Sequence, residues 1–218
     1  MDLARLSPDY IKELAAHHVG GRLKVAPEHT DPKVLAAMKK PPHGTFEDFA
    51  EKFARENERA GKKQFLVPYF ISSHPGSDLK AMIALALYLK KHGYKPDQVQ
   101  DFIPSPMDLA TAMFYTGRNP ETGEEMPVAR GMRDRRLQRA LLQFFKPENY
   151  FEVREALLKA GQGDLIGEGR ECLIGPRPPR EALDARRRAA SEALRDHVHA
   201  QEMPKASRGY RPGRKTWK

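Results

Sequence analysis

The sequence has little of what a disulfide-linked or membrane-spanning protein needs. Its single cysteine, Cys172, excludes an internal disulfide and a metal site built from several thiolates of this chain. The longest apolar stretch, Met82 to Leu89, is far shorter than the roughly 20 residues that a bilayer requires. Residues 1–16 carry charged side chains along their length and lack the apolar segment of a secretory signal. We therefore expect a soluble, cytoplasmic protein without a membrane partner.

The positive charge is concentrated at one end of the chain. The formal net charge is +9, yet residues 1–175 hold 26 basic against 24 acidic side chains, whereas residues 176–218 hold 12 against 5. The latter segment is also poor in large apolar side chains, which predicts a basic, disordered tail with a candidate helix from Arg180 to Ala200. Charge alone is expected to give this tail weak affinity for RNA or another polyanion.

Predicted strands alternate with predicted helices along the first half of the chain. The expected strands are Arg22–Ala26, Gln64–Ile71 and Val99–Ile103, and the second is apolar enough to be buried on both faces. Ser77 is expected to cap the helix that follows the second strand. Helices are expected at residues 7–19, 30–40, 45–61, 77–93, 108–115, 134–145 and 147–160.

This alternation is typical of parallel βαβ units, in which functional groups gather where the strands end. Polar side chains follow all three strands. Such a rim of donors and acceptors suits a nucleotide-like ligand, although each residue could instead have only a capping or turn role. The side chains concerned are Lys24, Glu28 and His29, then Ser72, Ser73 and His74, then Ser105 and Asp108.

Four long segments, in order along the chain, carry a resemblance to a known family. They are LKVAPEHTDPKVLAAMKKP (Leu23–Pro41), GKKQFLVPYFISSHPGS (Gly61–Ser77), QVQDFIPSPMDLATAMFYTGRNP (Gln98–Pro120) and KPENYFEVREALLKAGQGDLIG (Lys146–Gly167). The chain resembles the YgiQ family of radical S-adenosylmethionine proteins over about residues 7–175.

The resemblance implies a partial TIM-like (βα) barrel and two cofactors. In that superfamily three cysteines of a CxxxCxxC loop hold a 4Fe–4S cluster, and reductive cleavage of S-adenosylmethionine at the cluster gives a radical that abstracts hydrogen. This chain departs from the pattern because Cys172 is its single cysteine. We therefore expect a half-barrel of parallel strands whose partner is a cysteine-bearing N-terminal half, in the same longer chain or in another polypeptide.

The resemblance also assigns residues and regions. The end of the strand numbered four in the barrel implies cofactor contacts by Lys24 and Glu28, the next strand end implies Ser72, Ser73 and His74, and the last implies Ile103 and Pro104. No metal ligand is expected in this chain. The implied regions are residues 1–116, the half-barrel; residues 117–175, a helical C-terminal extension; and residues 176–218, the basic tail.

Two functions remain open from the sequence. The first is a portion of a radical S-adenosylmethionine enzyme that is inactive alone. The second is a non-catalytic scaffold that binds RNA or another polyanion through the tail. Three strands cut from a barrel leave Leu23–Ala26 as an unpaired edge, which predicts self-association or a molten character of the free chain.

Overall fold

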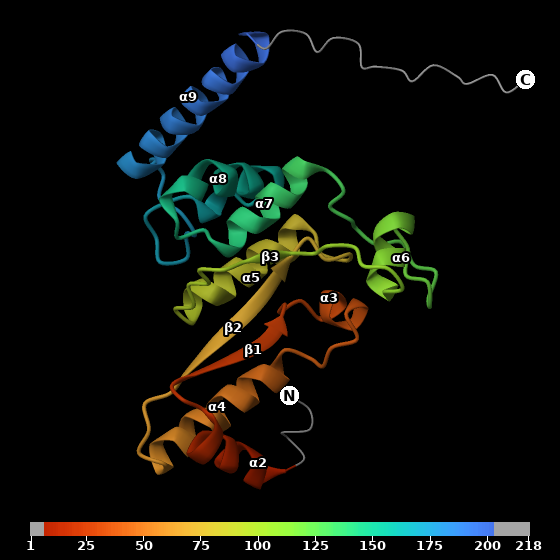
Figure 1. The fold of residues 1–218 in the computed structure, drawn as a ribbon, viewed down its shortest axis with the longest axis vertical. Coiled ribbons are helices and arrows are strands. Elements are labelled where there is room, and N and C mark those ends of the chain that lie inside the picture. The colour runs from red at the N-terminus through yellow and green to blue at the C-terminus, as the bar shows by residue number, and fades with distance from the viewer. Residues whose placement is uncertain (1–6, 203–218) are drawn as a thin grey trace, which may run out of the picture.

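The computed structural model describes residues 7–202 and contains a parallel sheet with helices packed against it (Figure 1). Three strands lie in the order β1-β2-β3, and both pairs are parallel. The chain is therefore α/β, as predicted, and its sheet is consistent with part of a (βα) barrel. The strands are β1 (Arg22–Glu28), β2 (Phe65–Ser72) and β3 (Gln100–Asp101).

The third strand is shorter than the expected range Val99–Ile103. Only Gln100 and Asp101 pair with β2, although the Phe102 amide still donates to the Ser72 carbonyl. Pro104 has no N–H for a ladder hydrogen bond, so the pairing with β2 cannot continue through it. As a result Ile103 is 70% exposed rather than part of a strand.

A helix follows each strand, and three of these helices begin in the same way. The carboxylates of Asp31, Asp78 and Asp108 each accept a backbone N–H from the first turn of the helix that follows. The prediction that Ser77 caps the helix after β2 is therefore wrong by one residue, because Asp78 is the cap. The Ser77 hydroxyl makes a different contact. The helices are α3 (Pro32–Ala37), α4 (Gly44–Arg59), α5 (Leu79–Lys91) and α6 (Leu109–Thr116).

The N-terminal segment packs under the sheet. It forms α2 (Pro8–Glu13), which continues as a π-helical turn, η1 (Leu14–His18), where the sequence predicts one helix. The side-chain amide of Gln64 donates to the carbonyls of Ala15 and Val19 at 2.9 and 2.8 Å, which satisfies acceptors at the end of this turn. Ile11, Ala15, Phe49 and Phe53 form a small core, against which Leu23, Val25 and Leu66 pack from the sheet.

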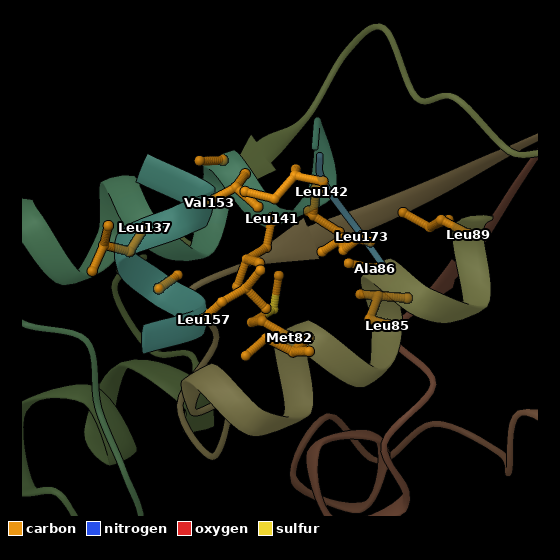
Figure 2. Close-up of a cluster of buried hydrophobic side chains, with 14 of the residues drawn as sticks. Met82, Leu85, Ala86, Leu89, Leu137, Leu141, Leu142, Val153, Leu157 and Leu173 are labelled. Atoms are coloured by element: carbon orange, nitrogen blue, oxygen red, sulfur yellow. The ribbon is translucent and has the colours of Figure 1, made fainter. Parts of the chain in front are cut away.

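The helices after residue 117 share the main core with the sheet. Leucines of α7 and α8 interdigitate with Met82 and Leu85 of α5 (Figure 2). The two regions predicted on either side of residue 117 therefore have a common interior, while the domain division itself stays a prediction. The elements are α7 (Met132–Leu142), η2 (Pro147–Asn149), α8 (Tyr150–Lys159), η3 (Gly163–Leu165) and α9 (Arg180–Glu202).

Helix α9 matches the helix predicted at Arg180 to Ala200. Its first turn is docked, because Ala182 is 1% exposed within the main core and the Arg186 guanidinium lies 4.6 Å from the centre of the Phe151 ring. The predicted disordered stretch around residues 208–215 lies outside the described residues. Between residues 7 and 202 no helix has both the length and the apolar character that a bilayer crossing requires.

One face of the sheet is open, which contradicts the expectation that β2 is buried on both faces. Phe65, which lies opposite Arg22 in the register, is 60% exposed. The physical reason is that α2, η1 and α4 pack on the face that carries Leu23, Val25 and Leu66. The opposite face is covered only in part: Val67 and Tyr69 are half-buried there, and residues 93–98 border a groove of about 500 Å³ beside them.

Candidate functional site

The carboxyl ends of the three strands meet at one edge of the sheet. Glu28 ends β1, Ser72 ends β2 and Asp101 ends β3, and Ser72 lies directly opposite Asp101 in the register. The convergence expected from the sequence is therefore confirmed, and the ligand contacts of these residues remain predictions. We call residues 28–29, 72–77 and 101–108 the strand-end rim.

The backbone of the strand-end rim is held in an uncommon conformation. Glu28, Ser73 and Met107 have φ values of 67°, 63° and 63°, and each lies at or after the end of a different strand. Within residues 7–202 the fourth non-glycine residue of this kind is Lys39. Left-handed conformations of non-glycine residues cost on the order of 1–3 kcal/mol each and cluster at ligand sites. Their distribution marks the rim as a site candidate on grounds that the sequence did not offer.

The turn after β2 is buried and is held by a distant glutamine. The Ser73 amide donates to Oε1 of Gln138 at 3.0 Å, and Nε2 of Gln138 donates to the Ser77 carbonyl at 2.9 Å. Ser73 is 1% exposed, and its hydroxyl has no hydrogen-bond partner. A buried hydroxyl without a partner is costly, which makes this turn a candidate ligand site.

His29 connects the turn after β1 to the turn after β2. Its Nδ1 accepts the amides of Thr30 and Asp31, both at 3.0 Å, so the proton is on Nε2, which lies 3.3 Å from the Ser77 hydroxyl. The side chain is fully buried, and this burial lowers the pKa of His29 to about 4. His29 is therefore a neutral donor that fixes two turns of the rim relative to each other.

His74 lies in the same turn with the opposite arrangement of its nitrogens. Its Nδ1 is 2.8 Å from the Pro75 carbonyl and donates to it, which leaves Nε2 as an acceptor. Burial lowers the pKa of His74, and the ring packs edge-on against Phe102, with the ring centres 5.2 Å apart. A neutral imidazole acceptor in this turn can bind an ammonium or hydroxyl group of a ligand.

The other predicted contacts are more scattered. Lys24 lies four residues before Glu28, about 13 Å along an extended strand, and its ammonium is over the Tyr69 ring at 5.6 Å. Glu28 pairs with Lys40 at 3.4 Å. Ile103 is exposed, and Pro104 is half-buried in the loop after β3. The structure thus brings Ser72, Ser73 and His74 together and separates Lys24 from them.

Polar contacts from α7 reach the rim and were not predicted. Asp101 accepts a hydrogen bond from the Ser72 hydroxyl and pairs with Arg139 at 3.0 Å. Arg135 donates to the Phe102 carbonyl at 2.7 Å. With Gln138, these side chains have the i, i+3, i+4 spacing of one helix face. The spacing of these three residues was visible in the sequence, but the sequence did not indicate that this face of α7 contacts the strand-end rim.

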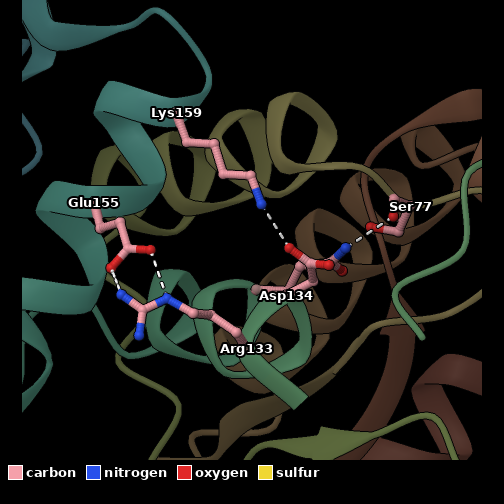
Figure 3. A network of polar contacts seen from close by, with 6 residues as sticks. Ser77, Arg133, Asp134, Glu155 and Lys159 are labelled. Atoms are coloured by element: carbon pink, nitrogen blue, oxygen red, sulfur yellow. Dashed lines mark hydrogen bonds and ion pairs between the residues drawn. The ribbon is translucent and has the colours of Figure 1, made fainter. Parts of the chain in front are cut away.

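A groove of about 760 Å³ lies between α7, α8 and α9, apart from the rim. Its wall is braced by the Arg133–Glu155 pair and by Lys159, which contacts Asp134 at 2.6 Å (Figure 3). Five basic and three acidic side chains line it, so the groove has a small excess of positive charge.

Iron–sulfur ligation does not fit the residues present. Cys172 is half-buried, and its carbonyl accepts a hydrogen bond from Lys90, near the end of α5 that is distant from the rim. Among the described residues, no group of three or more His, Cys, Asp or Glu is arranged to hold a metal ion. A cluster needs several thiolates, which this chain does not have.

Comparison with known proteins links this architecture to one family. The model of the DUF3362 family, described as a domain of unknown function, matches residues 97–214, slightly more than half of the chain. UPF0313 proteins of Clostridium botulinum and Clostridium perfringens are 54% identical over 166 and 165 residues, which is 76% of this chain. A UPF0313 protein of Vibrio cholerae is 44% identical over an alignment of 223 residues that covers 97% of this chain.

These relatives are longer proteins. The chain spans 26%, 25% and 28% of their lengths, respectively, so the activity of the whole relatives cannot be transferred to it. The UPF0313 proteins form the YgiQ family, which is the resemblance found in the sequence. The chain belongs to the DUF3362 family, and its relatives are UPF0313 proteins of the YgiQ family.

Proposed function

We propose that the strand-end rim binds S-adenosylmethionine as part of a radical S-adenosylmethionine enzyme. The observation that carries the proposal is the buried Ser73 hydroxyl without a partner, on a left-handed residue at the point where three parallel strands end. Strain and an unsatisfied donor in one place are features of a prepared ligand site. The resemblance of residues 7–175 to YgiQ proteins supplies the identity of the ligand.

The chemistry of the rim suits the polar groups of this ligand. The ligand carries an ammonium and ribose hydroxyls, for which Nε2 of His74 and the carboxylate of Glu28 are acceptors, and a carboxylate, for which the Ser73 hydroxyl is a donor. When bound at a reduced cluster, S-adenosylmethionine supplies the hydrogen-abstracting radical of this superfamily. The thiolates for that cluster have to come from outside this chain, because Cys172 is its one cysteine.

Equilibrium dialysis of this chain with S-adenosylmethionine tests the proposal. We expect saturable binding that Ser73→Gly weakens by about tenfold, the effect of losing one hydrogen bond to a charged group. Glycine accepts the left-handed φ of 63°, so this variant removes the hydroxyl without backbone strain.

Lys39→Gly is the matched control. Lys39 is also left-handed, with φ 53°, and it lies at the end of α3 outside the rim. It should leave the affinity unchanged. Absence of saturable binding to the unmodified chain, or equal binding by Ser73→Gly, would overturn the assignment.

A second candidate is a scaffold that binds polyanions. Arg186, Arg187 and Arg188 are consecutive and exposed on α9. Binding of this kind weakens steeply with salt because phosphate counterions are released. Salt-sensitive RNA binding without S-adenosylmethionine binding would favour this function over the first.

A further inference from the structure

We propose that α7, an element of the DUF3362 region, is a clamp that sets the geometry of the strand-end rim. Its positioning residues are Arg135, Gln138 and Arg139. The rim's role in ligand binding rests on the proposed function, whereas the clamp itself rests on the contacts described below.

The three side chains form one face of α7. The spacing i, i+3 and i+4 makes them neighbours on the helix surface. Arg135 reaches the Phe102 carbonyl just after β3, Arg139 reaches the Asp101 carboxylate at the end of β3, and Gln138 reaches the turn after β2. A single helix face therefore holds the ends of two adjacent strands.

Gln138 is the centre of this clamp. It is 3% exposed, and its amide bonds both ends of the turn, accepting from the Ser73 amide and donating to the Ser77 carbonyl. These backbone partners fix which end of the amide is oxygen, because an N–H needs an acceptor and a carbonyl needs a donor. The clamp thereby holds the left-handed Ser73, whose hydroxyl is the unpartnered donor of the rim.

The arginines compensate for the shortness of β3. This strand pairs with β2 at two positions only, so few ladder hydrogen bonds hold its end. Arg139 pairs with Asp101, which also accepts the Ser72 hydroxyl, and this links α7, β3 and β2 in one chain of contacts. The rim around β3 is thus fixed mainly from α7.

Helix α7 is itself held in place by packing and by polar contacts. Leu137 and Leu141 of α7 are buried against α5 and α8 in the main core (Figure 2). On the next part of the helix surface, Arg133 makes two hydrogen bonds to Glu155, and Asp134 bonds Lys159 (Figure 3). Because α7 is held on both sides, its polar face can hold the rim against the strain of Ser73.

The experiment compares Gln138→Met with Gln143→Met in this chain. Gln143 is also buried next to α7 and also makes two hydrogen bonds, but to the carbonyls of Pro96 and Asp97 in the loop before β3. The two variants remove the same chemical group with a side chain of similar length. Amide hydrogen exchange is measured in peptides that cover residues 72–77, and S-adenosylmethionine affinity is measured by dialysis.

We expect Gln138→Met to speed exchange at residues 72–77 by at least about tenfold, which corresponds to one lost buried hydrogen bond, and to weaken ligand binding. Gln143→Met should leave both unchanged, even if the two variants lose similar thermal stability. Unchanged exchange at residues 72–77 in a folded Gln138→Met variant, or the same change in Gln143→Met, would overturn the clamp.

Gln138→Glu provides a reversible version of the test. A protonated carboxyl has the donor and acceptor pattern of the amide, whereas a carboxylate repels the Ser77 carbonyl. Protection of residues 72–77 relative to the unmodified chain should return as the pH falls, and protection that stays independent of pH would contradict the clamp.

The exchange measurement also separates this inference from the proposed function. If the unmodified chain does not bind S-adenosylmethionine, the proposed ligand fails, while faster exchange in Gln138→Met still supports the clamp. If the unmodified chain binds and Gln138→Met binds equally with unchanged exchange, the clamp fails and the proposed ligand stands.

Discussion

His29 shows how one buried side chain can organise a site without contacting a ligand. Two backbone amides donate to its Nδ1, and its Nε2 proton is directed at Ser77 in a turn 48 residues away. Both nitrogens are therefore used by the neutral ring, and a second proton would have to displace two backbone donors. Protonation of His29 is incompatible with the observed turn.

The first prediction concerns the pH dependence of stability. The folded-state pKa of His29 is lowered to about 4, so between that value and 6.5 the unfolded chain binds more protons than the folded chain. Stability from this residue is present above about pH 6.5 and is lost as the pH falls towards 4, by on the order of 2 kcal/mol at about pH 4.5. Burial lowers the pKa values of His43 and His74 as well, which acts in the same direction.

His29→Asn isolates this contribution. Asparagine can accept backbone amides in such a turn but does not titrate, so the variant should be less stable at about pH 7 and lose less stability on acidification. Urea unfolding at about pH 7 and about pH 4.5 measures the free energy of unfolding of both proteins. The exposed His17→Asn serves as the control, and an unaltered pH slope in His29→Asn would refute the role of His29.

At the scale of elements, α9 is a basic helix with one docked end. Its first turn places Ala182 in the main core, and Arg186 covers Phe151, whereas Ala189 further along the helix is exposed. The composition of this segment predicts a solvated tail, because it has few large apolar side chains. A small alanine and the stem of an arginine are enough to attach it.

Replacing two alanines of α9 with aspartate, one at a time, tests this attachment. Ala182→Asp would bury an unpaired charge and should lower the free energy of unfolding by about 2–4 kcal/mol, whereas Ala189→Asp should change it by less than about 0.5 kcal/mol. Urea denaturation followed by far-ultraviolet dichroism gives both values. Equal, small effects would mean that α9 is not part of the folded body.

At the scale of the whole molecule, the sheet has an unpaired edge and an open face. β1 pairs only with β2 among the described strands, and Phe65 is 60% exposed on the uncovered face. Parallel strands are normally covered on both faces. A surface of this kind favours association with another polypeptide segment or with a second copy of this chain.

We expect this chain to self-associate or to be loosely packed when it is expressed alone, and to become monodisperse when it is co-expressed with the proposed cysteine-bearing N-terminal half. Phe65→Lys should reduce self-association in sedimentation velocity, since it places a charge on the open face. Tyr10→Lys changes an aromatic residue of similar exposure, 53%, on α2 and should have no such effect. If the unmodified chain is monomeric and well packed, the prediction of self-association is wrong.

The sequence by itself determined the parts of this protein that depend on neighbours along the chain. Strand and helix periodicity predicted a parallel α/β sheet, and the positions of β1, α4, α7 and α9 are close to their expected ranges. Polar residues after each strand predicted that Ser72, Ser73 and His74 gather at one edge. These features follow from the local pattern of apolar, capping and turn residues.

Only the tertiary structure decided how that edge is built. The Gln138 contacts join residues 65 and 61 positions apart, and no local pattern encodes which buried amide meets which turn. The same is true of the left-handed φ at Ser73 and of the docking of Ala182. Each of them depends on packing between distant segments, which fixes the chain in conformations that its local propensities do not favour.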